Sequence, residues 1–115
     1  MEKLVRDLIP DIIRAKGEEC VVRVAASDQE YADFLNVKLG EEIGEFYSAA
    51  DAGHRVEEMA DVMEVIRAVM KFYGIDANEV ERIREDKLKK RGGFEKRIIW
   101  KDTVGYYENK AGKAK

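Results

Sequence analysis

Carboxylates interrupt two lines of apolar residues in this sequence, and each line has the spacing of one face of an α-helix. The first line steps by 4, 3 and 4 residues and consists of Leu35, Leu39, Glu42 and Phe46. The second line is acidic at one end and apolar at the other, and consists of Glu58, Asp61, Val65 and Ala68. Residues at these spacings share a helix face. We therefore expect two long helices that pack together along a seam containing acidic groups.

A turn is expected between these helices, near Gly53 and His54. Glu45 lies eight residues before Gly53 and Asp61 lies eight residues after it, so an antiparallel hairpin would bring these two carboxylates level. Like charges about 5 Å apart repel by roughly 3 kcal/mol at an effective dielectric constant near 20. A hard divalent cation such as Mg²⁺, which prefers oxygen ligands, would relieve that repulsion. The sequence thus indicates a metal site, and a solvated acidic face is the ordinary alternative because 39% of the residues are charged.

The acidic groups also form two short motifs, E-E-x-x-E at 41–45 and E-x-x-D at 58–61, which are separated by the twelve residues 46–57. This combination resembles the signature of the all-α nucleoside triphosphate pyrophosphohydrolases, the MazG-like superfamily. Two flanking stretches, KLVRDLIPDII at 3–13 and RGGFEKRI at 91–98, resemble one branch of it, the house-cleaning phosphatases labelled phosphoribosyl-ATP pyrophosphohydrolase-like. The resemblance covers most of residues 3–99.

The resemblance implies Mg²⁺-dependent hydrolysis of a nucleoside triphosphate to the monophosphate and pyrophosphate, with Mn²⁺ able to replace Mg²⁺. Removal of non-standard nucleotides is the purpose that it suggests. Phosphoribosyl-ATP pyrophosphohydrolase of histidine biosynthesis, which performs the same chemistry on a dedicated substrate, is one alternative. A non-catalytic helical interaction module, whose acids are surface charge, is an alternative of a different class.

With this resemblance, the mechanism hypothesis assigns roles to individual residues. The expected metal ligands are Glu42, Glu45, Glu58 and Asp61. Glu41 or Glu42 is expected to orient or deprotonate the attacking water, although ligand and base are not distinguishable from sequence. Lys38, Lys87 and Arg91 are expected to offset charge on the phosphates. For Lys87 and Arg91, which lie four residues apart at a helix end, a favourable interaction with the helix dipole is the ordinary explanation.

Periodicity and capping signals predict four helices and one strand. The helices are expected over about 8–16, 28–52, 55–73 and 77–90. Ser27 with Glu30 forms a capping box at the start of the second helix. The valine-rich residues 20–25 predict a short strand, and residues 94–100 are its candidate partner. The predicted fold is all-α, a helical hairpin or bundle of about four helices with a minor extended element.

Several individual residues have two readings. Gly40 and Gly44 lie inside a predicted helix, where each costs about 1 kcal/mol relative to alanine, and close helix packing is favoured over room for a ligand. Arg6 and Asp7 are expected to supply a cap and a salt bridge, while the resemblance adds phosphate binding or scaffolding by Arg6. His54 is expected to be a surface or cap residue.

Length and composition limit the remaining possibilities. A chain of 115 residues suits one domain, expected over 1–106 with a flexible tail over 107–115. The small core and an apolar third helix favour a homo-oligomer, a dimer or a tetramer. A net charge of −3 argues against a nucleic-acid partner. The single Cys20 fits a reduced cytoplasmic compartment. We expect no signal peptide and no membrane-spanning segment, since the sequence contains no apolar run of 18 residues.

Overall fold

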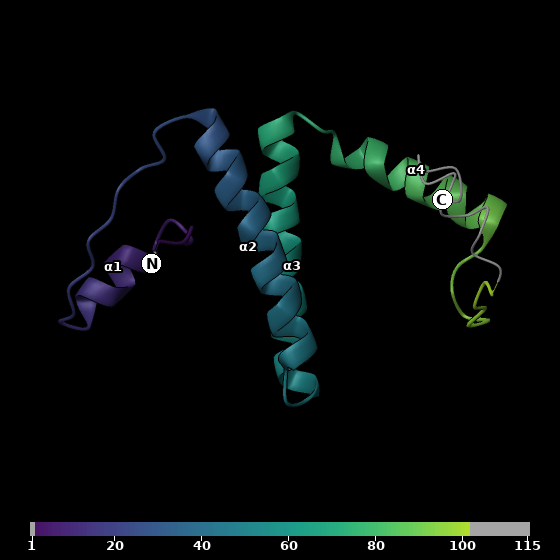
Figure 1. The fold of residues 1–115 in the computed structure, drawn as a ribbon, viewed down its shortest axis with the longest axis horizontal. Coiled ribbons are helices and arrows are strands. Elements are labelled where there is room, and N and C mark those ends of the chain that lie inside the picture. The colour runs from purple at the N-terminus through teal and green to yellow at the C-terminus, as the bar shows by residue number, and fades with distance from the viewer. Residues whose placement is uncertain (1, 102–115) are drawn as a thin grey trace. The chain divides into compact units, whose positions relative to one another are not determined.

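The computed structural model describes residues 2–101, which form four helices (Figure 1). No strand occurs within these residues, so the all-α prediction is confirmed. The chain divides into two compact units, with the boundary in the sequence between Glu79 and Val80, and each unit is described by itself. The expected single domain over 1–106 stays a prediction, and the expected tail over 107–115 lies outside the described residues.

Helix α1 spans Ile9–Ala15 and is short because both of its ends carry strong signals. Leu8 is the N-cap and Pro10 lies in the first turn, where a missing backbone N–H costs nothing. Gly17, with φ +83°, adopts the left-handed conformation after the last turn. The predicted start of this helix is confirmed.

Helix α2 spans Asp28–Ser48 and begins at the expected cap. The Ser27 hydroxyl accepts a hydrogen bond from the backbone N–H of Glu30 at 3.1 Å. The Glu30 carboxylate accepts from the backbone N–H of Ala26 at 2.7 Å, one residue before the position that a capping box prescribes. The helix is therefore anchored at its start by two side chains that the sequence identifies.

Helix α3 spans Ala52–Tyr73, and the turn before it lies earlier than predicted. The turn occupies residues 49–51, and Asp51 caps α3 by accepting a hydrogen bond from the backbone N–H of His54 at 2.9 Å. Gly53 lies within the first turn of α3, so the predicted helix end at 52 and start at 55 are wrong. The reason is that an aspartate N-cap satisfies free helix N–H groups, which Gly53 cannot do.

Helices α2 and α3 pack side by side as an antiparallel hairpin (Figure 1). Leu35, which is 2% exposed, and Val62, which is 9% exposed, are the buried apolar residues of the described chain. At the open end of the hairpin, the rings of Tyr31 and Phe72 meet edge to face with centroids 5.4 Å apart. Because each helix buries only one narrow stripe, the core of this hairpin is thin.

The two glycines of α2 do not serve the packing of this hairpin. Gly40 and Gly44 are exposed, and a Cβ added at either position would meet no atom within 4 Å. The favoured explanation, close helix packing, is therefore wrong for the described chain.

The predicted strand at residues 20–25 is also wrong. These residues form an irregular connection, in which Val21 is 95% exposed and Val24 is 89% exposed. The proposed partner, residues 94–100, is irregular as well. A strand needs a hydrogen-bonded neighbour, and valine enrichment reports only fitness for a half-buried pleated surface.

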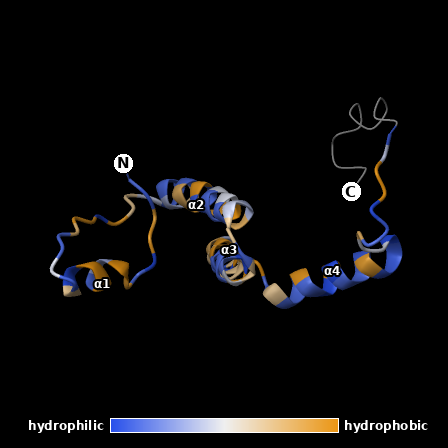
Figure 2. Cartoon of the chain, turned by 90° about the horizontal axis from the view of Figure 1, so that it is seen from below, coloured by the Kyte–Doolittle hydropathy of each residue, from blue (hydrophilic) through white to orange (hydrophobic). Residues whose placement is uncertain are grey.

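Helix α4 spans Ala77–Arg91. Asp76 accepts a hydrogen bond from the backbone N–H of Asn78 at 2.8 Å near its start. The helix is hydrophilic along most of its length (Figure 2) and carries pairs such as Lys90–Asp86 at 3.1 Å. Gly92, with φ +80°, follows its last residue.

Candidate metal centre

The hairpin brings three acidic side chains together. One carboxylate oxygen from each of Glu42, Glu58 and Asp61 lies within 4.8 Å of the other two. The turn explains this grouping, because Glu42 lies eight residues before its middle residue, Ala50, and Glu58 lies eight residues after it. Asp61 is three residues beyond Glu58 and shares its helix face. Three of the four predicted metal ligands are thus neighbours.

Two oxygen atoms of this group lack hydrogen-bond partners. Oε2 of Glu42 and Oε2 of Glu58 are both buried and accept no hydrogen bond from any of residues 2–101. Glu42 as a whole is only 7% exposed. A buried polar atom without a partner costs about 1–3 kcal/mol, so an unbound site of this kind is destabilising. Two buried, unsatisfied oxygens beside a third carboxylate are the donor set that a hard cation binds.

The pKa of Glu42 also shows that its ionised form is disfavoured at this position. Burial raises the pKa of the Glu42 carboxyl above its ordinary value, and the negative charges of Glu45 and Asp61 raise this pKa further. Lys38 acts in the opposite direction. A cation bound at the group would favour the ionised form and reverse the effect of burial.

Three cationic side chains form ion pairs with acids in this group or next to it. Arg6 donates from Nη2 to Oδ1 of Asp61 at 2.6 Å. Nζ of Lys38 lies 3.2 Å from Oε2 of Glu41 and 3.5 Å from Oε1 of Glu42. Lys3 is 3.8 Å from Oε2 of Glu41. Lys38 therefore stands where the sequence hypothesis needs a positive charge, and its contact with substrate stays a prediction.

Glu41 and Glu45 lie outside the group of three. Glu41 is half-buried and paired with lysines, and its role in activating water stays a prediction. Glu45 is exposed, although its charge still acts on Glu42. The expected level match of Glu45 with Asp61 assumed a turn at Gly53 and is wrong for that reason. Metal binding by Glu45 itself stays a prediction.

A pocket of about 290 Å³ opens beside the acids. Its walls come from the N-terminal segment, α2 and α3, and they include Leu4, Arg6, Lys38, Glu42, Asp61 and Val65. Glu42 and Asp61 face this pocket, and Glu58 completes the acidic group from outside its lining. The pocket therefore has a carboxylate wall and two cations within one compact unit.

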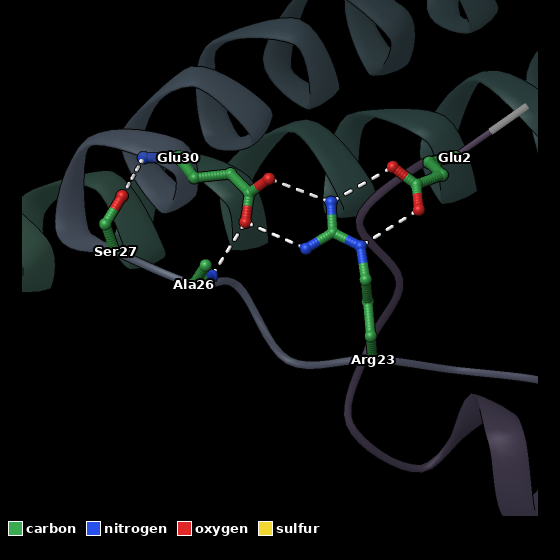
Figure 3. Close-up of polar contacts among 5 residues, drawn as sticks. All are labelled: Glu2, Arg23, Ala26, Ser27 and Glu30. Carbon is green, nitrogen blue, oxygen red and sulfur yellow. Dashed lines mark hydrogen bonds and ion pairs between the residues drawn. The ribbon is translucent and has the colours of Figure 1, made fainter.

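The N-terminal segment that forms one wall is fastened by Arg23 (Figure 3). The Arg23 guanidinium makes paired hydrogen bonds to both oxygens of Glu2, at 2.9 and 3.0 Å, and to both oxygens of Glu30, at 2.9 and 2.8 Å. The pKa of Glu30 is lowered to about 2. The hydrogen bonds from Arg23 are the largest cause, and the hydrogen bond from the backbone N–H of Ala26 is the second. This network ties residue 2 to the start of α2.

Sequence reasoning missed the partners of Arg6 and Arg23. Arg6 and Asp61 are 55 residues apart in the chain, and no helical spacing connects them. The charged pair before α1 was a signal for a salt bridge, but not for its partner. Lys87 and Arg91 are exposed near the end of α4, in the second unit, and their role as a phosphate clamp stays a prediction.

Comparisons with known proteins add one relative. A stretch of 49 residues, 43% of this chain, is 49% identical to an uncharacterized protein of Mycolicibacterium smegmatis (strain ATCC 700084 / mc(2)155). The matched part spans about half of that relative, 49% of its length. No family model and no solved structure matches the chain. Among residues 2–101, no helix combines the length and the apolar character needed to cross a membrane.

Proposed function

We propose that the chain is a Mg²⁺-dependent nucleoside triphosphate pyrophosphohydrolase that acts on non-standard nucleotides in a reduced, cytoplasmic compartment. The observation that carries the proposal is the pair of buried, unpartnered oxygens of Glu42 and Glu58 beside Asp61. The acidic motifs and their resemblance to the MazG-like superfamily supply the reaction class.

The three acids supply the oxygen ligands that a hard divalent cation prefers, and the distances between their oxygens are close to those around a bound Mg²⁺. Mg²⁺ prefers oxygen ligands at about 2.1 Å, so two ligands on opposite sides of the ion stand about 4.2 Å apart. The three oxygens spread over as much as 4.8 Å, which small side-chain movements would close. Glu42, Glu58 and Asp61 would hold the ion, with Glu45 as the further ligand of the hypothesis. Mn²⁺ has the same ligand preference and is expected to substitute.

The chain's own residues would then divide the remaining work. A Mg²⁺ ion held by these acids would supply positive charge to the phosphates and a water of lowered pKa. Arg6 and Lys38, both in the pocket lining, would neutralise phosphate oxygens, with Lys87 and Arg91 as the further cations of the hypothesis. Glu41 would accept a proton as water adds across the anhydride bond between the α- and β-phosphates. The products are the nucleoside monophosphate and pyrophosphate.

Pyrophosphate release is the direct test. The substrates are standard, deaminated and oxidised nucleoside triphosphates together with phosphoribosyl-ATP, each with and without Mg²⁺. We expect Mg²⁺-dependent release that falls by at least about 100-fold in Glu42→Gln, Glu58→Gln and Asp61→Asn. Glu57→Gln, on the exposed side of the same helix, is the matched control and should retain activity.

The same assay separates the alternatives. Release from phosphoribosyl-ATP alone would identify the histidine-pathway reaction. If folded protein released no pyrophosphate from any of these substrates and showed no thermal shift on adding Mg²⁺, the proposal would be contradicted. That result would favour a non-catalytic interaction module. Full activity in the three variants would contradict the assignment of the acids.

A homo-oligomer is part of the proposal. A stripe on α3 has heptad-like steps of 3, 4, 3, 4 and 3 residues and consists of Val56, Met59, Met63, Ile66, Met70 and Tyr73. Met63 is 59% exposed and Tyr73 is 62% exposed, so the stripe points away from α2. Such an apolar seam packs against a second helix in coiled-coil geometry. A second copy of the chain, which carries the same seam, is the proposed occupant.

A further inference from the structure

The ion pair between Arg6 and Asp61 occupies one member of the acidic group. Arg6 bonds directly to Oδ1 of Asp61 at 2.6 Å, and both residues line the same pocket. Glu42 and Glu58 keep buried oxygens without partners next to this pair. Arg6 is therefore in a position to compete with a cation for Asp61 and, by a small movement, to face whatever fills the pocket.

We propose that Arg6 is an exchangeable counter-ion: it holds Asp61 in the metal-free site, gives Asp61 up to a divalent cation, and then binds a phosphate group of the substrate. The inference rests on the proposed function, and it assigns Arg6 a role in both metal and phosphate binding. No covalent bond forms or breaks in this exchange.

The exposure of the pair makes the exchange feasible. The Arg6 side chain is 57% exposed and that of Asp61 is 38% exposed. An ion pair at such exposure contributes little to stability, because water solvates both partners well when they separate. A divalent cation held by three carboxylates outweighs that contribution. The planar guanidinium is also well suited to paired hydrogen bonds with phosphate.

The anchoring of the N-terminal segment keeps Arg6 at the pocket after it leaves Asp61. Arg23 holds Glu2 through two hydrogen bonds, four residues before Arg6 (Figure 3). Leu4 and Val5, between them, are half-buried and line the pocket. Arg6 would therefore turn within the pocket while the backbone beside it stays in place.

Lys38 does not share this freedom. Its side chain is 15% exposed and contacts Glu41 and Glu42, which lie on its own helix. A cation at the acids would still leave Lys38 paired with Glu41. Within residues 2–101, Arg6 forms an ion pair with Asp61 alone, and Asp61 is an acid that the metal itself would claim.

Manganese affinity tests the first half of the exchange. Mn²⁺ binding to the full chain is measured by the electron paramagnetic resonance of free Mn²⁺, without nucleotide. We expect Arg6→Gln to bind Mn²⁺ about two- to fivefold more tightly than the wild type, because the metal no longer displaces an ion pair. Arg84→Gln, which removes an exposed arginine paired on α4, is the matched control and should leave the affinity unchanged. A merely structural role for Arg6 would give weaker or equal Mn²⁺ binding.

Inorganic tripolyphosphate, which carries no base, tests the second half. With Mn²⁺ saturating, we expect Arg6→Gln to bind it about tenfold more weakly and Arg6→Lys to recover part of the loss. In the wild type, the side-chain ¹⁵N resonance of Arg6 should shift on adding Mg²⁺ while that of Arg84 stays in place. This last measurement needs no variant and is independent of any effect on folding.

The outcomes separate this inference from the proposed function. A wild type that binds Mn²⁺, with an Arg6→Gln variant that binds it no more tightly, overturns only the exchange. Tighter Mn²⁺ binding with unchanged tripolyphosphate affinity overturns the transfer to phosphate. A wild type that binds no Mn²⁺ overturns both the exchange and the metal site beneath it.

Discussion

Glu42 on α2 and Glu58 on α3 lie at the same level of the hairpin, each eight residues from Ala50, and each holds a buried Oε2 atom without a hydrogen-bond partner. This relationship is costly for a protein without a bound cation, since two carboxylates at a shared seam repel each other and lose solvation.

Addition of Mg²⁺ should stabilise the wild type. Binding to the folded state alone contributes about 2.7 kcal/mol when the free Mg²⁺ concentration is 100 times its dissociation constant. Differential scanning calorimetry with Mg²⁺ and with a chelator measures the shift in Tm. Glu42→Gln should abolish the shift while Glu57→Gln keeps it. An equal shift in both variants would contradict a site at Glu42.

Acid should weaken the attachment of the N-terminal segment. The pKa of Glu30 is lowered from 4.5 to about 2, chiefly by hydrogen bonds from Arg23. A lowered carboxyl pKa contributes stability that is fully present above pH 4.5 and is lost as the pH falls toward about 2. Urea unfolding across this range should show the wild type exceeding Arg23→Gln in stability near pH 6. The difference should shrink toward pH 2, and a constant difference would contradict the role of the network.

Alanine at the two exposed glycines of α2 should stabilise the helix. An added Cβ at Gly40 or Gly44 meets no atom within 4 Å, so only the helix propensity changes. We expect an increase of about 1 kcal/mol in the free energy of unfolding for each substitution. Urea unfolding at fixed protein concentration measures it. A loss of stability accompanied by dissociation would instead place these glycines in an interface between copies.

A charge on the exposed stripe of α3 should dissociate the oligomer. Met63 is 59% exposed in the middle of that stripe, and a lysine there would have to lose its hydration in the proposed interface. Light scattering coupled to size-exclusion chromatography should report a smaller species for Met63→Lys than for the wild type. Glu57→Lys, which lies outside the stripe on the same helix, should leave the mass unchanged. A monomeric wild type would contradict the proposal directly.

The helices could be predicted from sequence because their signals are local. Pro10 and Ser27 stand at the predicted starts of α1 and α2, and Gly74, the left-handed C-cap of α3, follows the predicted end of that helix at residue 73. The turn was misplaced because two local signals competed, the glycine at 53 and the aspartate at 51. The capping hydrogen bond of Asp51 determines where α3 begins. A pattern of hydrophobic residues does not show that this cap outweighs the turn preference of Gly53.

The sequence predicts that three of the acids lie together, and it identifies only part of their surroundings. Glu42, Glu58 and Asp61 could be selected because helical spacing places them on apolar stripes. The contact of Arg6 with Asp61 depends on the path of the irregular N-terminal segment, which no periodicity describes. The strand predicted around Val21 is wrong for a different reason. Its residues have a local preference for strand, but no neighbouring strand is present in residues 2–101 to pair with them.

The length of the short turn at residues 49–51 sets how the acidic side chains of α2 and α3 line up with one another. One residue added to or removed from a helix advances every following side chain by about 1.5 Å and rotates it by roughly 100°. A change of a single residue between Ser48 and Ala52, if absorbed by α3, would therefore turn Glu58 and Asp61 away from Glu42. The relative positions of the three acids therefore depend on the number of residues in a turn that contributes no ligand to the group.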